Sequence, residues 1–169
     1  FDAAGAACAY RSFAAPAAAS LHASAADLTR FLEAQMEGAR DPALPRDIMT
    51  AMRTPHASQF GLPIWGLGVM LYSEAPGGGF IIGHEGMNFP AIETTARIDP
   101  ATGDGILVLT TGAPGLAAKL GGDWVYWHAG RVDVRELDGM IRGMALTLLA
   151  GWAVILSLAG LLLWRLWRT

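Results

Sequence analysis

The spacing of hydrophobic residues changes twice along this chain of 169 residues, and each change marks a change in the expected structure. Residues 1–19 show no clear period, whereas between about residues 24 and 60 apolar residues recur three or four positions apart, which is the period of a helix. From there to residue 111 they form short blocks rich in branched and aromatic residues, which favours strands. After Pro114 the helical spacing returns. Helices, an antiparallel meander and a further helix together predict an α+β fold.

Two helices are expected before the strands. Ser24 and Asp27 have the spacing of a capping box, which satisfies free N–H groups of a first helical turn. Gly38 stands where a helix C-terminus often has glycine. The apolar residues between them at helical spacing are Leu28, Phe31, Leu32 and Met36. A second short helix is predicted over residues 45–53, with Ile48, Met49 and Met52 facing inward.

Four strands are expected, joined by segments rich in turn-forming residues. They are predicted over residues 64–72, 80–86, 91–98 and 106–111. Residues 76–79 and 99–105 supply the glycines, prolines and aspartates of the connecting turns. In the helix after Pro114, one packing stripe is expected from Leu116, Leu120, Trp124 and Trp127.

The most apolar stretch lies near the C-terminus, where no charged residue appears between Arg142 and Arg165. A helix over residues 143–164 spans about 33 Å, which is enough to cross a hydrocarbon core of about 30 Å. Trp164 and Trp167 stand at its end, as residues of an aromatic belt do. We therefore predict a transmembrane helix over 143–164 that contacts lipid, a polar linker over 131–142 and a short tail over 165–169.

Net charge and the absence of several motifs exclude some classes of function. A net charge of −3 gives no basic face, so nucleic acid is not an expected partner. The pair His84-Glu85 begins a zinc-protease motif, but the second histidine of that motif is replaced by Asn88. We therefore expect no metal and no cofactor. The sole lysine, Lys119, has no serine three residues before it, and no Gly-x-Ser-x-Gly elbow is present, so the chain carries no recognisable activated nucleophile.

The stretch around His84 is the strongest candidate for chemistry. It reads Phe-Ile-Ile-Gly-His-Glu-Gly-Met over residues 80–87, and places a histidine and an acid between two glycines on a predicted strand. Glycine lets another backbone or a ligand approach a strand closely. The same pattern also suits a tight bend at a sheet edge with a solvated histidine, and both interpretations stay open on these residues alone.

Four segments in order resemble the serine β-lactamase-like family, which includes class C β-lactamases, D-Ala-D-Ala carboxypeptidases, penicillin-binding proteins and related esterases. Ser20–Leu32 is similar to its "sLysTaaDLarFl" stretch, and Trp65–Val69 to its "yGlGw" strand. Gly83-His84-Glu85-Gly86 resembles its third active-site motif, Lys-Thr-Gly or His-x-Gly. Residues 99–111 resemble the strand that follows. The resemblance covers residues 1–130 and implies the C-terminal portion of a β-lactamase-related domain.

The resemblance implies a serine hydrolase that transfers an acyl group from an ester, an amide or a β-lactam. In the family, the serine of Ser-x-x-Lys attacks and the third-motif strand lies along the substrate. His84 would then be catalytic and contact substrate, together with Glu85. Gly86 would admit the substrate, and the N–H of Met87 would face the developing oxyanion. Ser-x-x-Lys and Tyr-x-Asn are expected upstream of this chain, which should be inactive alone.

A non-catalytic alternative uses the same scaffold: a membrane-anchored relative that binds peptidoglycan or a protein partner. In either case the resemblance implies a small-molecule or peptidoglycan-like ligand. Arginines flank the apolar span on both sides, so their count gives no orientation. Because the family works outside the cytoplasm, we expect a single-pass protein with its globular part outside and Thr169 inside. The sequence gives no oligomeric state.

Overall fold

The computed structural model describes residues 14–88 and 92–168, together with residues 2, 4, 6, 7 and 9. Ala91, the expected start of the third strand, and Thr169 therefore lie outside the described residues. The chain divides into two compact units, Phe1–Val134 and Arg135–Thr169. The first contains all six strands, and the second consists of most of the C-terminal helix.

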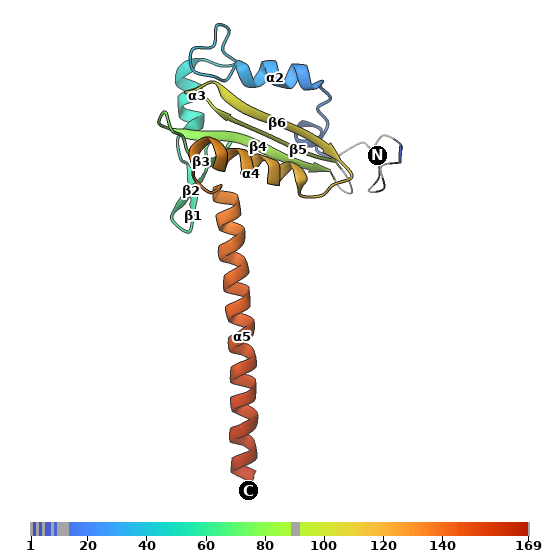
Figure 1. Cartoon of the computed structure of the whole chain (residues 1–169), viewed down its shortest axis with the longest axis vertical. Coiled ribbons are helices and arrows are strands. Elements are labelled where there is room, and N and C mark those ends of the chain that lie inside the picture. The colour runs from blue at the N-terminus through green and yellow to red at the C-terminus, as the bar shows by residue number, and fades with distance from the viewer. Residues whose placement is uncertain are drawn as a thin grey trace. The chain divides into compact units, whose positions relative to one another are not determined.

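The first unit is built on an antiparallel sheet whose strands follow one another in sequence order, β1-β2-β3-β4-β5-β6 (Figure 1). The strands are β1 Ala57–Gln59, β2 Leu62–Trp65, β3 Met70–Glu74, β4 Phe80–Asn88, β5 Ile92–Asp99 and β6 Asp104–Thr111. Such a meander needs only short turns between neighbouring strands. The predicted α+β fold with an antiparallel sheet is confirmed.

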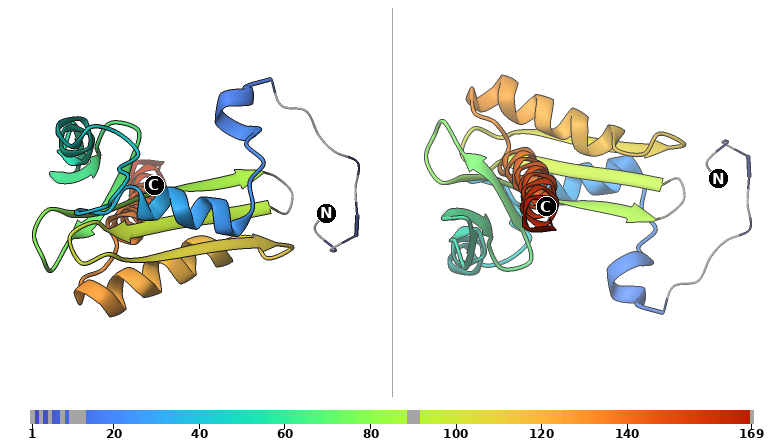
Figure 2. Two further views of the ribbon diagram at one scale, coloured as in Figure 1. Left: turned by 90° about the horizontal axis from the view of Figure 1, so that it is seen from above. Right: turned by 90° about the horizontal axis from the view of Figure 1, so that it is seen from below.

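Helices cover both faces of this sheet (Figure 2). Those on one face are α2 Ala25–Glu33 and α3 Arg46–Arg53, and the one on the other is α4 Leu116–Ala129; the short helix α1 Pro16–Ala19 precedes α2. We call the face that packs on α4 the α4 face; its buried cluster is Met70, Tyr72, Ile81 and Val125. The α2–α3 face has the cluster Val69, Leu71, Ile82 and Ile98, against which Leu32, Met36 and Met52 pack.

The capping box at the start of α2 is confirmed. The Ser24 hydroxyl accepts from the Asp27 N–H at 3.1 Å, and the Asp27 carboxylate accepts from the Ser24 N–H at 3.2 Å. The helix ends at Glu33, one turn before the predicted Gly38. No residue of α2 is fully buried, so this helix covers the α2–α3 face only loosely.

The strand predicted over residues 64–72 is wrong in one respect, because the chain turns back within it. β2 ends at Trp65 and β3 begins at Met70, and Trp65 pairs with Met70 across the turn. Gly68 has φ +71°, a conformation that favours glycine. The expected "yGlGw" strand is therefore a tight turn, and the six strands replace the four predicted.

The packing stripe predicted for α4 is confirmed only at Trp124, which packs against the buried cluster of the α4 face. Leu116, Leu120 and Trp127 are 40%, 39% and 79% exposed, whereas the buried residues of α4 are Ala117, Gly121, Gly122 and Val125. Small residues face the sheet because the large side chain of Arg97 lies there, beneath the helix. Three of the four large residues chosen by hydrophobic size therefore do not face the sheet.

The C-terminal helix, α5, runs over Val134–Arg168 and is long and apolar enough to cross a membrane. It contains the predicted span 143–164 and begins nine residues earlier, so most of the predicted linker is helical. No side chain of its most apolar window is buried in protein. A helix that is apolar on all sides and is not buried in protein has the features expected of a membrane span.

Candidate functional site

Strand β4 divides its residues between the two faces of the sheet. Side chains alternate along a strand, and residues paired across an antiparallel ladder share a face. Ile82 pairs with Ile98 in the cluster on the α2–α3 face, so His84 and its partner Ala96 lie on that face too. Glu85 pairs with Thr95 and lies on the α4 face. The motif residues His84 and Glu85 therefore point in opposite directions.

His84 lies at the point where β4 loses its neighbour on one side. β3 pairs with β4 from Phe80 as far as Gly83, and residues 84–88 pair only with β5 among the strands described. The His84 side chain is exposed, and its ring centroid lies 5.8 Å from that of Trp65. This end of β4 is an open sheet edge that presents an imidazole beside an indole.

The imidazole has a defined proton arrangement. His84 Nδ1 lies 2.6 Å from the Glu85 carbonyl oxygen, which can only accept a hydrogen bond. Nδ1 therefore carries the proton in this contact, and in the neutral ring Nε2 has the free lone pair. A ring in this tautomer can accept a proton or a hydrogen bond at Nε2.

Glu85 does not share this site. Its carboxylate lies 2.5 Å from Arg97 Nη2, and its side chain is only 16% exposed. Arg97 itself is 1% exposed beneath α4. The structure thus separates Glu85 from His84 and gives its carboxylate a buried cation as partner.

The two glycines that flank the pair also serve the sheet. A Cβ added at Gly83 would collide with the Ala96 carbonyl oxygen, and one added at Gly86 would lie 2.8 Å from Thr94 Oγ1. Both therefore allow β5 to approach β4 closely. Gly86 is exposed and Met87 is 67% exposed, so both lie on the surface of the open edge.

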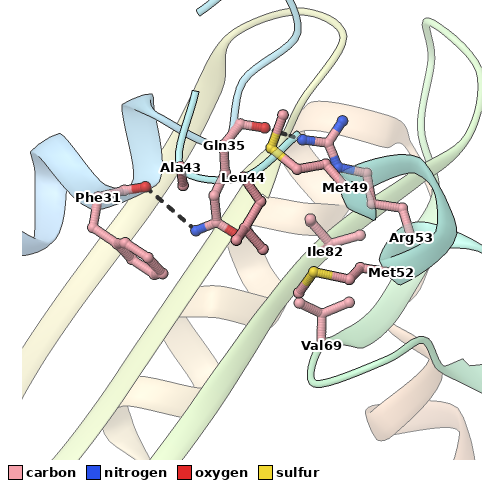
Figure 3. Close-up of a pocket in the computed structure, with 9 residues that line it drawn as sticks. All are labelled: Phe31, Gln35, Ala43, Leu44, Met49, Met52, Arg53, Val69 and Ile82. Carbon is pink, nitrogen blue, oxygen red and sulfur yellow. Dashed lines mark hydrogen bonds between the residues drawn. The ribbon is translucent and has the colours of Figure 1, made fainter. Parts of the chain in front are cut away.

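An apolar cavity of about 200 Å³ lies on the α2–α3 face (Figure 3). Ile82, which lines it, is two residues from His84 on the same face of β4. The polar groups at its rim bind one another: Arg53 donates to the Gln35 carbonyl oxygen, and the Gln35 amide donates to that of Phe31 at 3.4 Å. Burial lowers the pKa of Arg53, while Glu37 opposes that shift. The remaining lining residues are Ala43, Leu44, Met49, Met52 and Val69.

A row of buried polar residues on β5 was missed by the sequence analysis. Glu93, Thr95, Arg97 and Asp99 alternate along the strand on the α4 face, and each is at most 8% exposed. Glu93 accepts from the Gly115 N–H at the start of α4 at 2.6 Å, and Asp99 lies 2.9 Å from His128 Nε2 near its end. Strict alternation of polar residues in 92–99 was a signal, but it usually marks a solvated face.

Among the residues that the structure describes, no group of three or more His, Cys, Asp and Glu side chains is arranged to hold a metal ion.

Comparison with models of known protein families identifies the family of the chain. The Beta-lactamase family model matches residues 2–131, which is most of the chain and includes the whole sheet and α4. The chain therefore belongs to the Beta-lactamase family, as its resemblance to the serine β-lactamase-like proteins implied. No curated protein sequence matches the chain.

Proposed function

We propose that this chain supplies the third-motif strand of a serine acyl hydrolase and that His84 contacts the substrate there. Membership of the Beta-lactamase family supports hydrolase chemistry. The observation that carries the proposal is the open end of β4, where His84 is exposed and residues 84–88 have a neighbouring strand on one side only among the described strands. An extended acyl substrate can lie along such an edge and form hydrogen bonds with its backbone.

The proposed roles follow from this geometry. Nε2 of His84 would accept a hydrogen bond or a proton from the reacting group, since Nδ1 is held by the Glu85 carbonyl oxygen. The N–H of Met87, on the exposed strand end, would stabilise the oxyanion. Glu85 is left out of the substrate site because Arg97 binds its carboxylate on the opposite face.

The cavity suggests the kind of substrate. Its walls are apolar, and its polar rim groups already bind one another. Because Ile82 and His84 lie two residues apart on one face, an ester or amide held at His84 could place an alkyl or aryl group in the cavity. We therefore propose acyl compounds with an apolar substituent as the substrate class.

The attacking serine has to come from outside these 169 residues, because they contain no Ser-x-x-Lys. The same fact favours the second candidate function, a non-catalytic relative that binds peptidoglycan or a protein partner at the open edge. In both, α5 would anchor the protein in a membrane as a single span, with the globular part outside the cytoplasm.

Covalent labelling tests the proposal. We expect the 169-residue chain to form no adduct with a fluorescent penicillin or an activated ester. The complete gene product that contains it should be labelled once per molecule, at the serine of Ser-x-x-Lys. A complete product that is neither labelled nor hydrolytic would overturn the enzyme and leave the binding protein. Stoichiometric labelling of the 169-residue chain would contradict the assignment of the nucleophile.

A cysteine added after Thr169 tests the orientation. In intact cells it should resist a membrane-impermeant thiol reagent. Labelling of that cysteine would place the C-terminus outside and reverse the proposed topology.

A further inference from the structure

We infer that Arg97 and Glu85 are positioning residues: the buried guanidinium holds Glu85 on the α4 face and thereby fixes His84 and the open end of β4. The inference rests on the proposed role of His84 for its consequence in activity, but its structural part stands without it. It replaces the expectation that Glu85 contacts substrate.

Arg97 is the largest fully buried side chain among the described residues, and its guanidinium is surrounded by partners. Nη2 donates to Glu85 Oε1 at 2.5 Å and to the Ala118 carbonyl oxygen at 3.3 Å. Nη1 donates to Asp133, and Nε donates to Thr95 Oγ1 at 3.3 Å. The guanidinium also lies 4.0 Å from the centre of the Tyr72 ring. One cation therefore joins β3, β4, β5, α4 and the segment that follows α4.

The helix above Arg97 is shaped for this cation. A Cβ added at Gly121 would lie 2.5 Å from Arg97 Nε and 2.8 Å from Cζ. Glycine is otherwise unfavourable inside a helix, by about 1 kcal/mol relative to alanine. A glycine at this position is thus explained by the space that the guanidinium needs.

The anchor acts where β4 is least supported. Beyond Gly83 the strand has lost β3 as a neighbour, so its orientation depends on β5 and on side-chain contacts. Glu85 is the second residue of that segment and directly follows His84. If Arg97 holds Glu85 on the α4 face, the alternation of side chains along β4 places His84 on the α2–α3 face. Release of Glu85 should let residues 84–88 separate from β5 more often.

The same guanidinium binds Asp133, the residue that directly precedes the C-terminal helix. Asp133 is 1% exposed and immediately precedes Val134, where α5 begins. The two carboxylates come from distant parts of the sequence: Glu85 from the motif strand, and Asp133 from the residue before α5. The cluster therefore links the strand that would meet substrate with the point where the chain leaves the domain.

A purely stabilising role is the alternative, because a buried ion pair can exist without any influence on a site. The two roles differ in where the effect appears. A positioning role predicts a local change at residues 84–88, whereas a stabilising role predicts a uniform loss of protection across the sheet.

Glu85→Ala is the informative variant, since Arg97 keeps Asp133 as a counter-ion and no buried carboxylate is left unpaired by the change. Amide hydrogen exchange would be followed on the full 169-residue chain in lipid nanodiscs. We expect exchange in residues 84–88 to rise by about tenfold or more, while residues 104–111 of β6 change little. Glu85→Gln keeps an acceptor for Arg97 and should restore most of the protection. Glu74→Ala, which removes an exposed partner of Arg131, is the matched control and should alter neither segment.

Two results would overturn the inference: unchanged exchange at 84–88 in Glu85→Ala, or an equal rise in both segments. In the complete gene product, Glu85→Ala should lower kcat with little change in KM, and Glu85→Gln should recover it. A rise in KM alone would instead make Glu85 a substrate contact. A wild-type product without activity would refute the proposed function, while the exchange result would still decide the positioning role.

Discussion

The two faces of the sheet differ in what fills them. On the α4 face, buried polar side chains of β5 bind partners at the N-cap, in the first turn and near the end of α4: Glu93 with Gly115, Arg97 with Ala118 and Asp99 with His128. On the α2–α3 face the contacts are apolar, α2 has no fully buried residue, and a cavity remains. One face is closed by specific polar bonds, whereas the other is loosely covered and open to a ligand.

The buried charged residues and the proposed substrate site therefore lie on different faces of the sheet. The buried charged groups lie on the α4 face, where Arg97 binds Glu85 and Asp133, and Asp99 binds His128. Glu93 Oε1 accepts from the Gly115 N–H, whereas its Oε2 has no hydrogen-bond partner among the described residues. The α2–α3 face offers one exposed imidazole on an open strand end and an apolar cavity. Substitutions on the α4 face should therefore change stability first, and those on the α2–α3 face should change activity first.

The largest effect is expected from His84→Ala in the complete gene product. Loss of a positioned acid–base or hydrogen-bonding group should lower kcat/KM by about 10²- to 10⁴-fold. The melting temperature should change little, since the side chain is exposed. His56→Ala is the matched control, because that histidine is also exposed and its Nε2 lies 3.0 Å from the Ala51 carbonyl oxygen. Full activity of His84→Ala would show that the substrate site is not on the α2–α3 face at His84.

The opposite behaviour is expected from Arg97→Met. It leaves the carboxylates of Glu85 and Asp133 buried without their cation, which should cost about 3–5 kcal/mol of unfolding free energy. Chemical denaturation of the full chain in detergent micelles, followed by tryptophan fluorescence, measures it. Arg131→Met, which removes an exposed ion pair with Glu74, should cost at most about 1 kcal/mol. Equal losses in the two variants would show that the α4 face is not held by this cluster.

Gly121→Ala tests the fit of α4 over Arg97 more finely. Alanine normally stabilises a helix interior by about 1 kcal/mol relative to glycine, but here its Cβ would lie 2.5 Å from Arg97 Nε. We expect a net destabilisation of about 1–3 kcal/mol, as in other overpacked cores. Gly139→Ala is the control, because an added Cβ there meets nothing within 4 Å, and it should be neutral or stabilising. A stabilised Gly121→Ala would mean that Arg97 does not need this space.

The sequence predicted the fold better than the packing within it. Period and turn residues located the helices and the antiparallel sheet, and the Ser24–Asp27 spacing predicted its cap, because these features depend on local chemistry. The α4 stripe failed at three of its four residues because the buried face of a helix depends on its partner, and Arg97 lies about 20 residues away in the chain. The same limit hid the ion pair of Glu85: adjacency to His84 suggested a shared site, whereas the pairing of β4 with β5 brings the Glu85 carboxylate to Arg97.

A smaller effect is expected when the cavity on the α2–α3 face is filled. Leu44 lines the cavity and is 42% exposed, so a larger side chain fits at its rim without disturbing the core. In the complete gene product, Leu44→Trp should lower kcat/KM for esters with long apolar acyl groups by about tenfold relative to acetyl esters. Leu21→Trp, at a residue that is 81% exposed and outside the cavity, is the control. Equal effects on both ester classes would show that the cavity does not bind the acyl group of the substrate.

The smallest effect concerns the cover of the α2–α3 face, which depends on how firmly α2 begins. Hydrogen bonds from the Ser24 side chain and backbone lower the pKa of Asp27 below its ordinary value of 3.8. A carboxyl whose pKa is depressed by folding stabilises the folded state above its unfolded pKa, and that contribution is lost as the pH falls through the folded pKa. Asp27→Asn should therefore be slightly less stable than wild type at pH 7, and the difference should shrink as the pH falls below 3.8 and through the lowered pKa of Asp27. Melting curves of both chains between pH 2 and pH 7 give this comparison. A difference that persists at the lowest pH would show that the Asp27 charge is not what holds the start of α2, and that this face is covered through the apolar contacts of Leu32 and Met36 alone.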